Sequence, residues 1–141
     1  MRDSVVAAQH VSRAYDHGRV SALQDVTLTN NDSARFENRW ICMKTDPNTK
    51  CVWLKGIDRL DLPVRHGEGK FIPRDAAVLN RLKSNGQIVL RYCNADGAPA
   101  NGKFPINPNG AIDDIAGICD PSGRIFGLMP HPEANVDRTN H

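Results

Sequence analysis

The sequence lacks the features that mark membrane, secreted and nucleic-acid-binding proteins. No apolar run approaches the ~20 residues that a membrane-spanning helix needs, and Met1 to Ser4 leads into no apolar region of the signal-peptide kind. The 18 Lys and Arg residues nearly balance the 16 Asp and Glu residues, and no basic run is interleaved with aromatic residues. We therefore expect a cytoplasmic protein that binds neither membranes nor nucleic acid.

Cysteine is scarce, and its placement argues against three roles. Cys42, Cys51, Cys93 and Cys119 form no C-x-x-C pair, and residues 1–30 contain no cysteine. Their spacing matches no closed zinc site, so we predict no metal site, and we expect reduced thiols instead of a disulfide framework. Cys42 and Cys119 fall within predicted strands, while Cys51 and Cys93 lack the flanking glycines of a nucleophile elbow. None of the four is predicted to be a catalytic nucleophile.

Short apolar runs alternate with turn signals along most of the chain, which predicts strands and loops in one domain or part of one. The strands expected are Val26–Thr29, Arg39–Lys44, Ile88–Tyr92, Ile115–Cys119 and Arg124–Met129, and a helix is expected over Arg74–Lys83 with Asp75 as its cap. The last two strands should pair as a hairpin across the turn at residues 120–123. Residues 4–15 have a possible helix cap but an imperfect apolar stripe.

A histidine and a glutamate stand two residues apart in a proline-stiffened loop after the second hairpin strand. These are His131 and Glu133. A histidine titrates near neutrality, and a carboxylate on its far nitrogen fixes the tautomer and supports the imidazolium. Such a pair normally serves a nucleophile, although the two side chains could also satisfy only local loop hydrogen bonds.

Two further stretches are candidates for parts of a site. Residues 94–110 form a long loop rich in Asn, Gly and Pro, and loops of that length without internal structure are often functional. Residues 107–110 of this loop are therefore candidates for part of a functional site. His66 lies between an arginine and a glycine, and we prefer a structural role for it, with the nearby glycines serving a tight turn between strands.

Several separate blocks, in the same order, resemble the glutamine amidotransferase subunit of phosphoribosylformylglycinamidine synthase. The blocks are residues 31–40, 62–71, 104–110, 113–124 and 127–133. The likeness runs from Leu23 to His141. It divides the chain into an unmatched N-terminal segment, residues 1–22, and the C-terminal portion of an amidotransferase domain, residues 23–141.

The resemblance implies an α/β fold of the class I glutamine amidotransferase (flavodoxin-like) type, with a sheet covered by helices on both faces plus β-hairpins. It implies a glutaminase that hydrolyses glutamine through a cysteine thioester and supplies ammonia for ATP-dependent amidine formation in purine biosynthesis. His131 would be the catalytic base and Glu133 its orienting residue. The substrate-binding residues implied or suggested are Asn31, Ser33, Phe36, Asn107 and Asn109.

The resemblance also implies the partners. Glutamine is the expected substrate, a synthetase subunit is the expected protein partner, and a small bridging subunit is a third candidate. No cofactor is expected in this chain, because ATP and Mg²⁺ would belong to the synthetase.

The chain departs from the family pattern at the nucleophile. The family's cysteine lies upstream of the block at residues 31–40 in a Gly-x-Cys-x-Gly-like elbow, which this sequence lacks together with the N-terminal half of the fold. Two interpretations follow. The chain is a fragment of a glutaminase that is inactive alone, or it is a catalytically dead homologue that acts only as a docking module.

Overall fold

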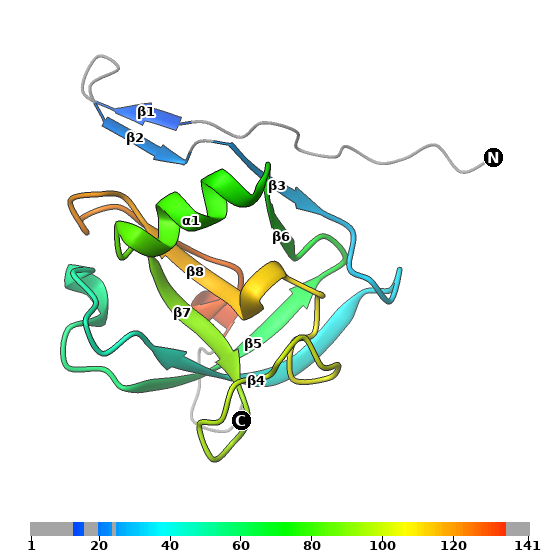
Figure 1. Cartoon of the computed structure of the whole chain (residues 1–141). Coiled ribbons are helices and arrows are strands. Elements are labelled where there is room, and N and C mark those ends of the chain that lie inside the picture. The colour runs from blue at the N-terminus through cyan, green and yellow to red at the C-terminus, as the bar shows by residue number, and fades with distance from the viewer. Residues whose placement is uncertain (1–12, 16–19, 24, 135–141) are drawn as a thin grey trace.

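The computed structural model describes residues 13–15, 20–23 and 25–134, and their strands form three sheets (Figure 1). The largest is an antiparallel five-stranded sheet in the order β5-β4-β7-β8-β9, and the pairs β3–β6 and β1–β2 are also antiparallel. The strands are β1 (Arg13–Tyr15), β2 (Val20–Leu23), β3 (Val26–Thr29), β4 (Glu37–Thr45), β5 (Arg59–His66), β6 (Lys70–Pro73), β7 (Ile88–Cys93), β8 (Ile115–Cys119) and β9 (Phe126–Leu128).

The strands predicted from apolar runs are present. β3 has the predicted bounds, and β4 extends the predicted segment by two residues at its start and one at its end. The alternation of β4 buries Ile41, Met43 and Thr45 on one face and leaves Cys42 only half-buried on the other. In the N-terminal stretch, Arg13–Tyr15 is a strand instead of part of a helix, and residues 4–12 lie outside the described residues.

The predicted hairpin joins β8 and β9. Asp120 fixes its turn by accepting hydrogen bonds from the backbone N–H groups of Ser122, Arg124 and Ile125 at 3.0, 2.8 and 2.8 Å. Gly123 adopts φ = 74°, a left-handed conformation that glycine adopts without strain. Burial raises the pKa of the Asp120 carboxyl, but the hydrogen bond from the Ser122 hydroxyl at 2.6 Å and the three backbone donors outweigh this effect, so that the pKa lies below its ordinary value. The turn therefore fixes the direction in which β9 runs back along β8.

The α-helix α1 (Ala76–Ser84) lies beside β6 (Figure 1). Val78 and Leu82, one turn apart, are buried in the core. Asp75 is the N-cap, as predicted, and its Oδ1 accepts a hydrogen bond from the Val78 N–H at 2.8 Å. Among the described residues, α1 is the only α-helix. The helices expected on both faces of the sheet are therefore not seen in those residues.

Replacing Asp75 by alanine is expected to destabilise the protein by about 1 kcal/mol, because the Val78 N–H loses its acceptor at the helix start. Urea unfolding followed by circular dichroism measures the change. The control is Asp58→Ala, which removes an exposed carboxylate with no side-chain hydrogen bond among residues 25–134 and is expected to change stability by less than about 0.5 kcal/mol. Equal effects of the two substitutions would contradict the capping role.

The core lies between the five-stranded sheet, the β3–β6 pair and α1. Its fully buried large side chains include Met43, Val64, Val78, Ile88, Val89, Leu90, Tyr92 and Ile115. Every residue of β8 is buried and β7 is buried apart from Arg91, as expected for strands in the interior of the sheet order. Within the described ranges, no helix combines the length and apolarity required to cross a membrane.

Candidate active site

Three backbone hydrogen bonds position the loop that follows β9. The Met129 N–H donates to the Ala116 carbonyl of β8 at 2.9 Å, and the His131 N–H donates to the Pro63 carbonyl of β5 at 2.8 Å. The Ala134 N–H then donates to the His131 carbonyl at 3.0 Å and closes the short 3₁₀ turn Pro132–Ala134. The hairpin thus presents His131 at its exit, as predicted, and attaches it to the opposite edge strand of the sheet.

The side chains of His131 and Glu133 contact each other. His131 Nδ1 lies 2.6 Å from Glu133 Oε1, which fixes the imidazole tautomer with a proton on Nδ1 and a lone pair on Nε2. The hydrogen bond from His131 lowers the pKa of the Glu133 carboxyl, so the carboxylate is ionised at neutral pH. This is the geometry of a base with its orienting carboxylate.

A second histidine, not predicted as part of the site, faces the free nitrogen of His131. His66 Nδ1, at the end of β5, lies 3.0 Å from His131 Nε2, and the ring centroids are 5.2 Å apart. With the His131 lone pair on Nε2, His66 donates its Nδ1 proton. A nucleophile that reached His131 Nε2 would take the place of this contact.

His66 is held in a crowded setting. A Cβ added at Gly69 would lie 2.1 Å from His66 Nε2, so this glycine allows close approach of the backbone to the imidazole, whereas a Cβ at Gly67 would meet nothing within 4 Å. His66 Nε2 is buried and has no hydrogen-bond partner among the described residues. The only sequence signal for this packing was the glycine-rich context of His66, which we interpreted as a turn.

Burial lowers the pKa of His66 below its ordinary value of 6.5 and outweighs the neighbouring Asn109 amide, which raises the pKa, while positive charge on His131 lowers it further. The unfolded chain therefore binds this proton first, and the stability contributed by neutral His66 is present above pH 6.5 and lost as the pH falls through the folded-state pKa. We expect the melting temperature to fall more steeply between about pH 7 and pH 5 in the wild type than in His66→Gln. Parallel pH profiles in calorimetry would contradict this expectation.

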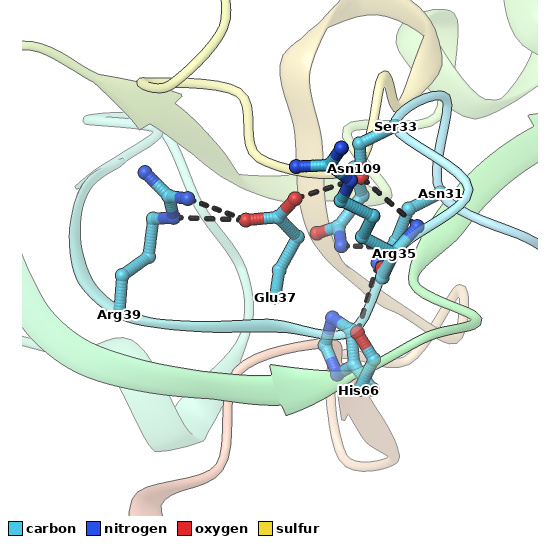
Figure 2. Close-up of polar contacts among 7 residues, drawn as sticks. All are labelled: Asn31, Ser33, Arg35, Glu37, Arg39, His66 and Asn109. Atoms are coloured by element: carbon cyan, nitrogen blue, oxygen red, sulfur yellow. Dashed lines mark hydrogen bonds and ion pairs between the residues drawn. The ribbon is translucent and has the colours of Figure 1, made fainter.

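Asn31 links the block at residues 31–40 to His66 (Figure 2). Its Nδ2 donates to the carbonyls of His66 and Arg35, both at 2.8 Å, and its Oδ1 accepts from the Gly69 N–H at 3.0 Å and from Asn109 Nδ2 at 2.7 Å. Tyr92, buried in β7, donates its hydroxyl to Asn109 Oδ1 at 3.1 Å. Both amides are buried, so they hold the turn beneath His66 in place.

Asn107 holds the following loop through a separate set of bonds. Its Oδ1 accepts from the N–H groups of Gly110 and Ala111, both at 3.0 Å, and its Nδ2 donates to the Ala111 carbonyl and to Asp114 Oδ1 at 2.8 and 2.9 Å. The four hydrogen bonds use the whole capacity of the amide. Residues 94–110 are therefore an ordered loop, tied to η2 (Ile112–Asp114).

Ser33 contacts an ion pair between the buried Glu37 and the partly exposed Arg39 (Figure 2). Ser33 Oγ donates to Glu37 Oε1 at 2.7 Å, and Arg39 binds Glu37 Oε2 at 2.5 Å. Burial raises the pKa of Glu37, but the bonds from Ser33 and Arg39 outweigh it and the pKa lies below its ordinary value. Arg39 also covers the Phe104 ring, 4.8 Å from its centroid, and Phe36 is 66% exposed.

The structure brings together some of the predicted substrate-binding residues. Asn31 and Asn109 are linked to His131 through His66, whereas Asn107 belongs to the neighbouring loop. The side-chain hydrogen bonds of Asn31 and Asn107 are all made within the protein, which favours a positioning role for them over direct contact with a ligand. Substrate contact by Ser33, Phe36 and the three asparagines stays a prediction.

The four cysteines lie away from His131 and contact one another instead. Cys42 and Cys93 are 3.3 Å apart, and Cys119 lies beside Cys51. All four carry free thiols. In residues 25–134, no group of three or more His, Cys, Asp or Glu side chains is arranged to hold a metal ion.

Comparison with known proteins places this arrangement in a class. Residues 9–141 match the family model of the CobB/CobQ-like glutamine amidotransferase domain. Together with the α/β fold and the histidine–glutamate pair, the match defines a domain of the glutamine amidotransferase type. The chain belongs to the family of CobB/CobQ-like glutamine amidotransferase domains. The match begins before residue 23, and our division of the chain into residues 1–22 and 23–141 stays a prediction.

Individual relatives are similar over most of the chain. The phosphoribosylformylglycinamidine synthase subunit PurQ of Methanococcus maripaludis is 52% identical over 122 residues, covering 86% of this chain and 42% of the relative. The PurQ subunit of Dehalococcoides mccartyi is 50% identical over 118 residues, covering 84% and 44%. The phosphoribosylformylglycinamidine synthase of Drosophila melanogaster is 41% identical over 116 residues, covering 81% and 8%. The chain thus spans less than half the length of these relatives.

One solved structure, described as PurLQS from Thermotoga maritima, contains a chain with a similar fold. The TM-score is 0.55 at 27% sequence identity, covering 79% of this chain and 44% of that one. The α/β class and the glutamine amidotransferase resemblance are thereby confirmed.

Proposed function

We propose that this chain is the base-carrying part of the glutaminase component of a phosphoribosylformylglycinamidine synthase. The observation that carries the proposal is the 2.6 Å contact between His131 Nδ1 and Glu133, which leaves Nε2 to take up a proton. Relatives named as PurQ subunits are 52% and 50% identical to this chain over 86% and 84% of its length, which supports the proposal. The reaction is hydrolysis of glutamine, with ammonia passed to a synthetase for ATP-dependent amidine formation in purine biosynthesis.

Each group has a defined task in this reaction. A cysteine thiolate outside the present sequence attacks the side-chain amide carbon of glutamine, and His131, protonated on Nε2, donates that proton to the departing ammonia. Water then attacks the γ-glutamyl thioester, with His131 as the base, and releases glutamate and the thiol. Glu133 stabilises the imidazolium throughout, and His66 leaves Nε2 when substrate and nucleophile enter.

The partners follow from this assignment. Glutamine is the substrate, the synthetase subunit is the protein partner, and a small bridging subunit is the third candidate. ATP and Mg²⁺ belong to the synthetase, and this chain holds no cofactor of its own. The expected compartment is the cytoplasm.

Alkylation by a diazo-ketone analogue of glutamine tests the proposal, because this reagent labels a thiolate held beside a base in a glutamine pocket. The folded chain alone should give no adduct in intact-mass analysis. A chimera that joins the N-terminal part of the Methanococcus maripaludis PurQ subunit to this chain should give one adduct, on a cysteine of the added part. An adduct on Cys42, Cys51, Cys93 or Cys119 would overturn the proposal that the nucleophile lies outside this sequence.

A docking module without catalysis is the second candidate. The observations in its favour are two exposed aromatic side chains, Phe36 at 66% and Phe104 at 58%, of which Phe104 lies beside Arg39. In that case the chain would bind the synthetase, and the chimera would bind it too but release no ammonia from glutamine. Ammonia release by the chimera excludes this alternative.

A further inference from the structure

Two cysteines that the proposed chemistry does not use lie side by side on neighbouring strands of the five-stranded sheet. Cys42 in β4 and Cys93 in β7 are direct partners in the antiparallel register, and their sulfur atoms lie 3.3 Å apart. Directly opposed antiparallel residues have Cα separations of about 4.5–5.5 Å, within the range of about 4.4–6.8 Å that a disulfide spans. The two thiols can therefore be joined with little movement of the backbone.

A small molecule can reach this pair from one side. Both cysteines line a cavity of about 380 Å³, whose wall also includes Asp61 of β5 and Pro105 and Ile106 of the long loop. Cys42 is half-buried, whereas Cys93 is only 3% exposed. A reagent entering the cavity thus meets the Cys42 sulfur first, with the Cys93 sulfur behind it.

The other two cysteines of the chain provide a comparison for the exposure and reactivity of this pair. Cys51 and Cys119 also lie next to each other, but each is only 1% exposed. Burial raises the pKa of Cys119 to about 11 and that of Cys93 to about 12. Buried protonated thiols are poor nucleophiles, so only Cys42 is placed to start a reaction with a reagent from solvent.

We propose that Cys42 and Cys93 form a modification site for small disulfides of the glutathione type, which convert the dithiol to a cross-strand disulfide. In the first step the Cys42 thiolate attacks one sulfur of the small disulfide, forming a mixed disulfide and releasing one small thiolate, which takes up the proton that Cys42 lost. In the second step Cys93 attacks the Cys42 sulfur, and the second small thiolate leaves with the Cys93 proton. Two protein thiols are oxidised, and one small disulfide is reduced to two small thiols.

The test is oxidation of the folded chain with glutathione disulfide, followed by removal of the oxidant, denaturation in the presence of iodoacetamide to block every remaining thiol, and peptide mapping without reductant. We expect two of the four thiols to escape alkylation, and the peptides with Cys42 and Cys93 to be joined. Dithiothreitol should restore all four thiols. Alkylation of all four after oxidation, a bond involving Cys51 or Cys119, or a glutathione adduct that persists on Cys42 would each overturn the proposal.

Three variants separate the two steps. Cys93→Ser should accumulate one glutathione on Cys42, because the resolving thiol is absent. Cys42→Ser should react at least roughly tenfold more slowly, since its remaining thiols are buried. Cys51→Ala, the matched control, should form the crosslink like the wild type. A Cys42→Ser variant that takes up glutathione at the wild-type rate would contradict the order of the two steps.

Discussion

Replacing His131 by alanine is expected to lower glutamine-dependent ammonia release by about 10³-fold, in the chimera with the Methanococcus maripaludis PurQ N-terminal part. The reason is that His131, with Glu133 on its Nδ1, is the group proposed to take the proton of the nucleophile and return it to the leaving ammonia. Coupled assays of glutamate formation measure the loss. Covalent labelling by the diazo-ketone analogue should be lost in parallel, because the nucleophilic thiolate loses the imidazole of His131.

Two controls distinguish loss of chemistry from loss of structure. Glu133→Gln keeps a hydrogen bond to His131 Nδ1 but removes the charge that supports the imidazolium, and should cost less, roughly 10- to 100-fold. With the synthetase partner present, activity on added ammonia should be unchanged in both variants, because that reaction bypasses the glutaminase. An alanine variant within about tenfold of the parent would exclude His131 as the base.

Replacing Asn31 by alanine is expected to have the largest effect on stability, about 3 kcal/mol. The substitution leaves four partners without their hydrogen bonds: the Arg35 and His66 carbonyls, the Gly69 N–H and the Asn109 amide. The site is buried, so water replaces those bonds poorly. Chemical denaturation measures the change in the free energy of unfolding.

The matched control for this substitution is Asn38→Ala, which removes an exposed amide from β4, seven positions along the same block of sequence. It is expected to change stability by less than about 0.5 kcal/mol. Asn31→Asp separates the two halves of the amide, because the carboxylate can still accept from Gly69 N but cannot donate to the two carbonyls. A loss below about 1 kcal/mol for Asn31→Ala would mean that the network does not hold the turn at His66.

The features that sequence could predict here are local ones. The cap at Asp75 and the turn at Asp120 depend on contacts within a few residues of each other, and the pairing of β8 with β9 follows from that turn. The strand Val26–Thr29 was predicted from its own β-branched residues, although its partner β6 is distant in the sequence. The contact between His131 and Glu133 is equally local, since only Pro132 stands between them in the sequence. Such contacts follow from turn chemistry and short-range geometry.

The rest depends on contacts between distant segments. His66 and His131 are 65 residues apart, and Asn31 and Asn109 are 78 apart, so neither pairing leaves a pattern along the sequence. Asn31 was predicted to touch substrate because its block resembles a pocket wall in the family, and that contact stays a prediction. Nothing in the sequence indicated the bonds from Asn31 to His66, Gly69 and Asn109, because these partners come from distant segments.

The bond from His131 N–H to the Pro63 carbonyl also bears on solubility. β5 is an edge strand of the five-stranded sheet, and an unpaired edge invites strands of other molecules to add to it. Pro63 offers no N–H at the middle of that edge, and the loop at His131 covers its carbonyl. The segment that carries His131 thereby also protects this edge of the sheet against association with strands of other molecules. Substitutions that displace the loop should promote self-association independently of any effect on chemistry.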